Sequence, residues 1–478
     1  MAESDIERLR DGIDHAWEEA RKFGLDPFPT HFELVPASIM YEFASYSLPG
    51  RFSHWTHGKA YHRQKMQYDF GLSKIYEMVV NTNPSYAFLM DMNDLLQNTF
   101  VAAHVFGHTD FFKNNAYFQH TSRRMIDKVS IHAERIAKYE FDHGKTEVEH
   151  FLDAVLSIQE HVDYNLLIRE EKPRNPDEEI PKSPGIYDDL WGLDQRERKA
   201  EEERERRPGK PAKFPEKPQK DILLFLSQHA PHLEPWQRDI IEIVRTEMLY
   251  FVPQMQTKVL NEGWASVWHS RIMRRLGETG VISDAQTIEF ATLHSGVLSP
   301  SRTSLNPYYL GFKMLEDIER RWNDPTQEEK DRLGRKPGMG LQKIFEVREM
   351  DNDVSFLRNY LTEDLVKELD LYLYKKEGDE WVIAEKNWEK VRDGIVASLN
   401  NFGSPYLVVE NGDFRGNREL LITHVFEGQE LDMNYAEKTL QYVYLLWGRP
   451  VHLETIYDGK KILISYDGER SSKSTLEK

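Results

Sequence analysis

Two histidines, His104 and His108, stand four residues apart within the apolar run of residues 100–112. On a helix, side chains four residues apart lie on the same face, so both imidazole rings can reach one metal ion. Buried imidazoles need polar partners, and a shared ion is one candidate. With 18 histidines in 478 residues, however, a pair at a given spacing arises easily by chance, so this pair needs support from other residues.

A second stretch supplies a carboxylate and a third imidazole. Glu262 and His269 are seven residues apart, which is two turns of a helix and therefore one face. We predict that they complete a site of histidine and carboxylate ligands, with Asn261 and Trp264 as neighbours that orient the ligands. The alternative is that Glu262 forms an ion pair with an arginine while His269 fills a packing gap.

Three further residues are candidates for the same site. His294 is a candidate fourth ligand or proton shuttle, although a single histidine near a helix end is more often a packed core residue. Asp110 is a candidate to orient a ligand imidazole and to take part in catalysis, and Glu134 is a candidate general base. For Glu134 the competing interpretation is an ordinary surface ion pair.

The available ligand types restrict the metal. The chain contains no cysteine, so an ion must be held by histidine, aspartate or glutamate. Zinc fits this donor set first, with iron and manganese as alternatives. A divalent ion with an open coordination position would lower the pKa of bound water, which favours a hydrolytic or Lewis-acid reaction.

The familiar metallopeptidase motifs are absent from the sequence. In the HExxH and HxxEH motifs a glutamate beside a histidine serves as general base, and Val105 and Gly107 occupy those places here. A two-iron carboxylate site is a further alternative, but the ExxH sequence at residues 147–150 has no second copy. Glu262 cannot readily be both ligand and base, so the general base is unassigned.

Helices are predicted to position these residues. One begins near residues 91–94 and carries the histidine pair; Gly107 in its middle costs about 1 kcal/mol relative to alanine, which indicates close approach of another backbone or of a metal-bound group. A second helix covers residues 257–276. We also predict one or two helices over residues 64–92 and an ordered loop over residues 25–64.

The expected fold is a mainly α-helical large domain, on a zincin-like or other helical metal-site scaffold, followed by a small C-terminal α+β domain. Strand periodicity is confined to the end of the chain. Five segments are predicted in sequence order: the N-terminal helical half with HxxxH (1–168), a charged proline-rich insertion (169–220), the second helical half (221–340), a helical connector (341–400) and the α+β domain (401–478).

Composition limits the classes of function. A chain of 478 residues with 40% hydrophobic content is long enough for two or three domains with substantial cores. No run approaches the roughly 18 apolar residues of a membrane span, and the N-terminus has no signal-peptide pattern. A soluble cytoplasmic protein is therefore expected, and the net charge of −18 argues against broad binding to nucleic acid or anionic membranes.

Several motifs together resemble one family, stage V sporulation protein R (SpoVR). They cover residues 83–90, 97–115, 234–238, 261–269, 306–311 and 446–450. The resemblance runs from about residue 5 to residue 465, and its combination of motifs is specific. All five predicted ligands, His104, His108, Glu262, His269 and His294, fall on matching positions.

The resemblance implies a cytoplasmic bacterial protein that acts in late sporulation and in spore cortex formation. It also implies a serine protein kinase and a von Willebrand-like protein as partners in a stress-linked module. It supplies no established reaction. Three hypotheses therefore stand: a metal-dependent hydrolase, a non-enzymatic regulatory or scaffold protein of such a kinase module, and a protein whose ion only stabilises the fold.

Overall fold

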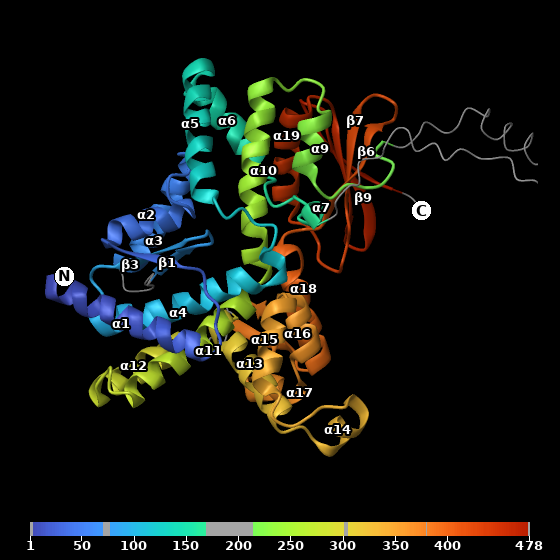
Figure 1. Cartoon of the computed structure of the whole chain (residues 1–478). Helices are drawn as coiled ribbons and strands as arrows, with labels where there is room; N and C mark the ends of the chain where they lie inside the picture. Colours follow the sequence, from blue (N-terminus) through green and yellow to red (C-terminus); the bar gives the residue numbers. More distant parts are fainter. Residues whose placement is uncertain (1–2, 70–76, 169–213, 301–304, 379, 477–478) are drawn as a thin grey trace, which may run out of the picture. The chain divides into compact units, whose positions relative to one another are not determined.

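The computed structural model describes residues 3–69, 77–168, 214–300, 305–378 and 380–476 (Figure 1). Of the predicted insertion at 169–220, residues 169–213 lie outside the described residues. The described chain forms two compact units. The first combines residues 1–149 and 249–404, and the second combines residues 150–248 and 405–478. Each unit is thus assembled from two separate stretches of sequence, whereas the predicted segments follow sequence order.

The first unit is mainly helical, as predicted. Its helices before the break are α1 (Glu3–Lys22), α2 (Ala37–Tyr46), α3 (Trp55–Asp69), α4 (Leu95–Asn114), the short η1 (Ala116–Phe118) and α5 (Met125–His143). After the break come α11 (Lys258–Glu278), α12 (Asp284–Val297), α13 (Pro307–Asn323), α14 (Gln327–Leu333), α15 (Gly340–Met350), α16 (Asp353–Tyr360), α17 (Glu363–Glu368), α18 (Trp388–Leu399) and η2 (Asn400–Gly403). Helices α6 (Lys145–Leu156) and α10 (Pro235–Gln256) run across the unit boundaries.

A three-stranded sheet near the N-terminus was not expected from the sequence. It consists of β1 (Thr30–Val35), β2 (Glu77–Val80) and β3 (Ser85–Met90) in the order β1-β3-β2, with β3 parallel to β1 and antiparallel to β2. The prediction of helix over residues 77–90 is therefore wrong. The six residues of β3 are nearly all buried and do not alternate, so periodicity cannot distinguish this strand from a buried helix.

The remaining strands of the first unit, β4 (Leu373–Glu377) and β5 (Glu380–Glu385), form a separate antiparallel pair. The predicted loop over residues 25–64 instead contains β1, α2 and the first part of α3. Its histidines are packed by aromatic rings: the ring centroids of Tyr46 and His57 lie 4.7 Å apart.

Helix α11 lies between α4 and α13 and packs against both. The backbones come very close at glycines. A Cβ atom on Gly107 would lie 2.6 Å from Cα of Ala265, and one on Gly263 would lie 2.3 Å from the carbonyl carbon of Gly311. The predicted close backbone approach at Gly107 is confirmed. Only residues without a Cβ atom allow the three helices to pack at this distance.

The N-terminus of α11 is capped by a residue far along the chain. Both carboxylate oxygens of Asp353 accept hydrogen bonds of 2.9 Å, from the backbone N–H groups of Val259 and Leu260. These N–H groups have no partner within their own helix, so the carboxylate satisfies donors that would otherwise be buried and unpaired. The cap fixes the start of α11, directly before Asn261 and Glu262.

The second unit is the predicted α+β domain, extended by helices from the middle of the chain. Its sheet has the order β10-β9-β8-β7-β6. The strands are β6 (Leu407–Phe414), β7 (Glu419–His424), β8 (Val451–Tyr457), β9 (Lys460–Tyr466) and β10 (Ser471–Thr475), and the helices are α7 (Asn165–Ile168), α9 (Ile222–His229) and α19 (Met433–Trp447). Helix α19 connects the parallel pair β7 and β8 and packs on β8 and β9.

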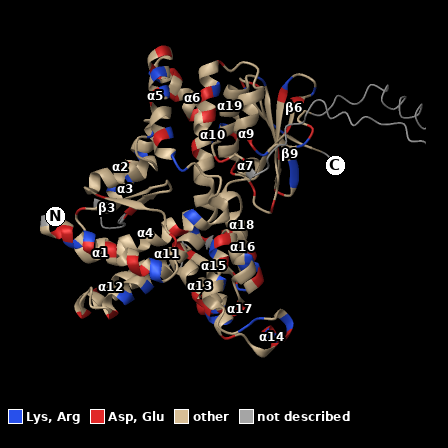
Figure 2. Ribbon diagram, viewed as in Figure 1, with Lys and Arg blue, Asp and Glu red and all other residues tan. Residues whose placement is uncertain are grey.

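Acidic and basic side chains are interspersed along the outer helices. Figure 2 shows both signs on α1, α5 and α13, as expected for helices with one buried and one solvated face. Within the residues that the structure describes, every helix is too short or too polar to cross a membrane.

Candidate metal centre

The histidine pair lies in the middle of α4, on a helix whose start is fixed by a side-chain cap. The carboxylate of Asp94 accepts a hydrogen bond of 2.7 Å from the backbone N–H of Gln97. His104 and His108 are only 4% and 7% exposed, and their ring centroids lie 4.5 Å apart. Two buried imidazoles in contact must each find polar partners.

One nitrogen of His108 is occupied by a neighbour that the sequence predicts. Its Nδ1 lies 3.0 Å from Oδ1 of Asn261 on α11. An amide oxygen only accepts hydrogen bonds, so this contact places the proton of a neutral ring on Nδ1. The Nε2 atom of His108 then carries a lone pair, which is the arrangement that a metal-binding imidazole needs.

Glu262 joins the two rings. Its Oε2 atom lies 3.4 Å from Nε2 of His104 and 3.4 Å from Nε2 of His108. These separations are long for hydrogen bonds, but they match the edge of a ligand tetrahedron around zinc, which is about 3.3 Å for bonds near 2.05 Å. Within the described chain, Nε2 of His104 and Oε2 of Glu262 are buried without any hydrogen-bond partner.

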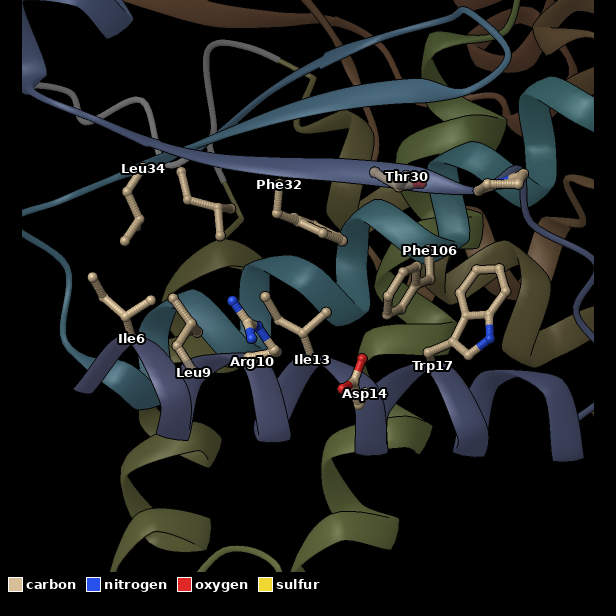
Figure 3. A pocket seen from close by; sticks show the side chains of 12 residues that line it. Ile6, Leu9, Arg10, Ile13, Asp14, Trp17, Thr30, Phe32, Leu34 and Phe106 are labelled. Carbon is tan, nitrogen blue, oxygen red and sulfur yellow. The ribbon is translucent and has the colours of Figure 1, made fainter. Parts of the chain in front are cut away.

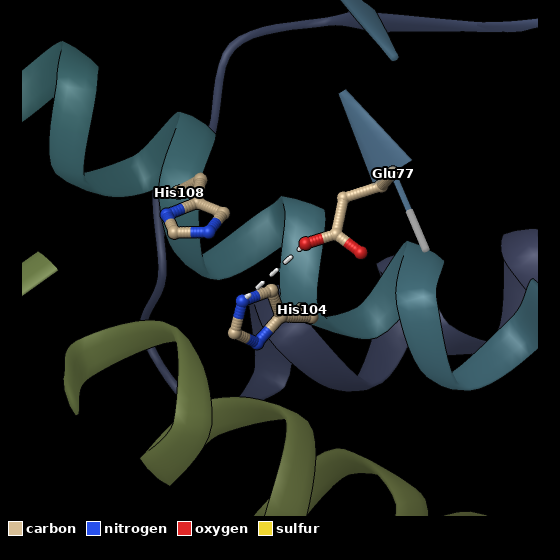
Figure 4. Close-up of side chains that lie close together, drawn as sticks. All are labelled: Glu77, His104 and His108. Carbon is tan, nitrogen blue, oxygen red and sulfur yellow. Dashed lines mark ion pairs between the residues drawn. The ribbon is translucent and has the colours of Figure 1, made fainter. Parts of the chain in front are cut away.

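Glu77 is a second carboxylate at the cluster, and the sequence did not point to it. It is the first residue of β2, and its Oε1 atom lies 3.9 Å from Nε2 of His104 (Figure 4). Ligand atoms of Glu77, His104 and His108 all lie within 4.8 Å of one another. A lone glutamate in a short strand has no spacing pattern that would reveal it.

The carboxylates and imidazoles shift one another's pKa values. Burial would raise the pKa of Glu262, but the imidazoles of His108 and His104 outweigh burial and hold this pKa well below its usual range. For His108, burial acts to lower the pKa, while the charge of Glu262 raises it above the ordinary value. Burial raises the pKa of Glu77. The two glutamates therefore differ: Glu262 is held in its charged form.

His269 and His294 were both predicted as ligands. His269 contacts His104, and His294 in turn contacts His269. Nδ1 of His269 is 2.8 Å from Nδ1 of His104, and its Nε2 is 2.8 Å from Nδ1 of His294. Burial, and then the neighbouring rings, lower the pKa of His269 well below the ordinary value; burial and then Arg274 lower that of His294 to about 4. In this arrangement both nitrogens of His269 are engaged by other histidines.

Tyr308, at the start of α13, is a further residue of the site that sequence reasoning missed. Its ring stacks on His104 with a centroid distance of 5.9 Å and an interplanar angle of 26°. Burial, and then the negative charges of Glu262 and Glu77, raise the pKa of Tyr308 well above the ordinary value. The hydroxyl therefore keeps its proton and serves as a donor.

A cavity of about 240 Å³ opens beside the cluster. It is lined by Glu77, Val79, His108, Phe112, Gln254, Lys258, Asn261, Glu262 and Tyr308. A larger cavity of about 440 Å³ lies between α1 and β1 (Figure 3), where apolar side chains such as Phe32 and Phe106 predominate. The larger cavity has no histidine in its lining, so the smaller one is the candidate reaction site.

Asp110 and Glu134, both predicted to act in catalysis, lie in other surroundings. Asp110 is fully buried and accepts hydrogen bonds from Nε1 of Trp264 at 2.9 Å and from the backbone N–H of Asp26 at 2.7 Å. These bonds tie α4 to α11 and to the chain after α1. Glu134 lies on the exposed side of α5. Among the described residues, neither Asp110 nor Glu134 contacts the imidazole rings of the cluster.

The arrangement fits a divalent metal ion. Two imidazole nitrogens and one or two carboxylate oxygens converge, and Nε2 of His104 and Oε2 of Glu262 have no hydrogen-bond partner among the described residues. This mixture of nitrogen and oxygen ligands suits zinc, iron and manganese. Asn261 and His269 provide the outer hydrogen bonds that orient ligand imidazoles in metal sites.

Comparison with known proteins identifies the family. Residues 3–404 match the SpoVR like protein family, and residues 405–458 match the SpoVR-like C-terminal domain. The chain is 28% identical over 486 residues to the uncharacterized protein YcgB of Escherichia coli (strain K12), and the similarity covers 94% of each chain. No solved structure matches the chain. The chain therefore belongs to the SpoVR family, as its motifs predict.

Proposed function

We propose that this SpoVR family member is a metal-dependent hydrolase that acts in sporulation, including spore cortex formation. His104, His108 and Glu262 hold one divalent ion, with zinc favoured over iron or manganese. The observation that carries the proposal is the position of Oε2 of Glu262, 3.4 Å from Nε2 of both histidines. In the described chain, neither this oxygen nor Nε2 of His104 has a hydrogen-bond partner.

The two carboxylates of the cluster take different roles. Glu262 is equidistant from both rings, so it is the ligand, whereas Glu77 lies 3.9 Å from His104 and is the general base. When bound, the ion supplies a Lewis acid for the substrate and for the attacking water. The carboxylate of Glu77 takes a proton from that water. Glu77 thus takes the role that a glutamate has in the HExxH motif, which this chain lacks.

Neighbouring residues hold this arrangement in place. Asn261 and His269 each occupy Nδ1 of a ligand ring and so aim its Nε2 atom at the ion. Tyr308 borders the cavity, where its hydroxyl can donate to a substrate oxygen. The cavity admits a small group beside the ligands.

The role in the cell follows from family membership. We infer a cytoplasmic location and a module shared with a serine protein kinase and a von Willebrand-like protein. The cortex polymer lies outside the membrane, so the hydrolase acts on a precursor or on a protein that controls cortex formation.

The test compares two matched variants, Glu262→Gln and Glu77→Gln. Purified protein is dialysed against metal-buffered solution, its metal content is measured by elemental mass spectrometry, and hydrolysis of a panel of peptides, amides and esters is followed. We expect one ion per wild-type chain, loss of ion and activity in Glu262→Gln, and retention of the ion without activity in Glu77→Gln.

Other outcomes separate the hypotheses. Loss of the ion in Glu77→Gln would make Glu77 a ligand and the assignment of the base wrong. A wild-type chain that binds no ion would remove the proposed function and favour a regulatory or scaffold protein. An ion that is bound without hydrolysis of any substrate, and whose removal unfolds the protein, would be structural.

A further inference from the structure

Strand β2, which contributes Glu77 to the cluster, is an edge strand. In the sheet order β1-β3-β2 it pairs with β3 on one side, and no strand of the described residues pairs with its other side. An edge strand presents backbone N–H and C=O groups that can pair with another extended chain. The residues of β2 that carry these free groups can be identified from the hydrogen bonds of β3.

In strand β3, alternate residues direct their backbone groups to opposite neighbours. The N–H of Ser85 donates to the carbonyl of Pro29 at 2.8 Å, and the N–H just after the strand, on Asp91, donates to the carbonyl of Val35 at 3.0 Å. Both acceptors belong to the β1 side. Because strand geometry repeats every two residues, the odd-numbered residues of β3 face β1 and the even-numbered residues face β2.

The register then fixes the orientation of β2. Phe88 lies opposite Met78, and Tyr86 lies opposite Val80. In an antiparallel pair, residues directly opposite each other exchange both hydrogen bonds or neither. Met78 and Val80 therefore bond to β3, and the two alternate residues of β2 direct their backbone groups to the free edge.

Those residues are Glu77 and Val79, and both also line the cavity at the cluster. The two residues whose backbone groups face the free edge of β2 thus also line the cavity of the proposed metal ligands. An extended chain that paired with Val79 would lie beside a residue of the lining that His108 and Glu262 share.

We propose that the substrate of the site is an extended, unfolded segment of polypeptide, which pairs with the free edge of β2 through the backbone N–H and C=O of Val79. This inference rests on the proposed hydrolase function and names its substrate class. Main-chain pairing of this kind supplies affinity that is largely independent of sequence, while side-chain pockets supply selectivity.

The size and charge of the cavity agree with such a substrate. At about 240 Å³ it is smaller than most small-molecule sites, which measure about 300–1,000 Å³. It accommodates a single side chain with its peptide group rather than a large ligand. The lining carries Lys258 and the carboxylates of Glu77 and Glu262. Once the proposed divalent ion offsets the two carboxylates, Lys258 is left to pair with an acidic side chain or a terminal carboxylate of the peptide.

Replacing Val79 by proline tests the pairing. Proline lacks the N–H, and at an edge position whose N–H faces away from the sheet it leaves the β2–β3 hydrogen bonds intact. Val79→Ala is the matched comparison: it also shortens the side chain but keeps the N–H, so the difference between the two variants reports on the N–H. The probe is a synthetic pool of unstructured ten-residue peptides, with binding measured by co-elution and cleavage by mass spectrometry.

We expect Val79→Pro to retain its metal ion and its thermal stability while binding and cleavage of the peptides fall about tenfold or more, as for the loss of a main-chain hydrogen bond in a buried site. Binding and cleavage should fall less in Val79→Ala than in Val79→Pro, because the alanine variant loses side-chain contacts in the cavity but keeps the N–H that pairs with the peptide. A second measurement uses wild-type protein and peptides N-methylated at single positions; one methylated position should abolish binding while its neighbours do not.

The outcomes distinguish this inference from the proposed function. Peptide cleavage that is equal in wild type and Val79→Pro, or hydrolysis of small amides and esters alone, would overturn the pairing while leaving a metal hydrolase. Peptides that bind the wild type and not Val79→Pro, without any hydrolysis, would support the pairing and remove the hydrolase. Indifference to N-methylation at every position would overturn the pairing in either case.

Discussion

Buried histidines contact glutamates in both units of the molecule, but in different ways. In the C-terminal sheet, His452 is 3% exposed; its Nδ1 lies 2.7 Å from Oγ of Ser465 and its Nε2 lies 2.8 Å from Oε2 of Glu419. Both ring nitrogens are satisfied within the protein. At the centre of the first unit, His104 and His108 each use Nδ1 in a hydrogen bond, and their Nε2 atoms converge on one carboxylate oxygen.

The two regions differ in whether their buried polar atoms are all hydrogen-bonded. Burial and a nearby glutamate are common to both regions, so neither feature distinguishes them. The distinguishing feature is the set of buried polar atoms that lack partners in the described chain, Nε2 of His104 and Oε2 of Glu262. Leaving such atoms unsatisfied costs about 1–3 kcal/mol each, and an ion between them would remove that cost.

The largest expected effect is a difference in metal affinity between variants of Glu262 and of Glu419. Glu262→Gln should lower metal affinity by more than about 100-fold, or about 2.7 kcal/mol, because removal of a ligand exceeds the effect of removing an orienting neighbour. Glu419→Gln should leave metal content unchanged. Metal titration with a competing chelator measures both. Equal loss of the ion in the two variants would contradict the assignment of the metal site to Glu262.

The second prediction concerns the backbone contact that brings the ligands together. Gly107→Ala would place a Cβ atom 2.6 Å from Cα of Ala265, so α4 and α11 must separate. We expect a loss of about 2–3 kcal/mol in stability, the upper range for overpacking, and weaker metal binding. Denaturant unfolding measures the stability. The control is Gly296→Ala in α12, where an added Cβ atom meets nothing within 4 Å. This substitution should leave stability unchanged or raise it.

The third prediction concerns pH and the second unit. Burial, and then the charge of Lys220, lower the pKa of His161 to about 4. The unfolded chain takes up this proton near pH 6.5, so its contribution to stability is complete above that pH and is lost as the pH falls toward 4. At pH 5 the loss is about 2 kcal/mol.

Unfolding of wild type and His161→Gln at pH 7 and pH 5 checks this prediction. The stability difference between the two proteins should shrink at the lower pH, because the variant has no proton to take up at this position. A difference that stays constant with pH would mean that His161 titrates alike in the folded and unfolded chain.

The smallest effect is expected at Ser465. Ser465→Ala removes one hydrogen bond to Nδ1 of His452 and should cost about 1 kcal/mol of stability. It should not change the bound metal, since His452 keeps its contact with Glu419. Calorimetry and elemental analysis measure the two quantities. A change in metal content would show that the second unit also binds an ion.

The candidate ligands with helical spacing could be predicted from the sequence. His104 and His108 share one face of α4, and Glu262 and His269 share one face of α11, so periodicity places each pair correctly on its element. Spacing does not show which ring nitrogen faces the ion and which faces a neighbour. His269 was for this reason predicted as a ligand, whereas both its nitrogens contact other histidines.

Glu77 and Tyr308 could not be predicted in the same way. Each joins the site from an element that contributes one residue to it, so no repeat exists to be recognised. Glu77 depends on β2, a four-residue strand in a stretch whose apolar pattern suggests helix. The close contact between Gly263 and Gly311 brings α13, and with it Tyr308, to the cluster, and a glycine alone does not reveal its partner.

The distance along the chain between the two halves of the cluster has a consequence for biosynthesis. His108 and Asn261 are 153 residues apart, and residues 150–248 between them belong to the other unit. At about 5–20 residues per second, α4 leaves the ribosome roughly 8–30 s before α11. Throughout that interval the histidine pair has no Glu262 and the apolar face of α4 is uncovered. The cluster of His104, His108 and Glu262 is therefore complete only after both stretches of the first unit have been synthesised, so any ion that all three residues bind enters late.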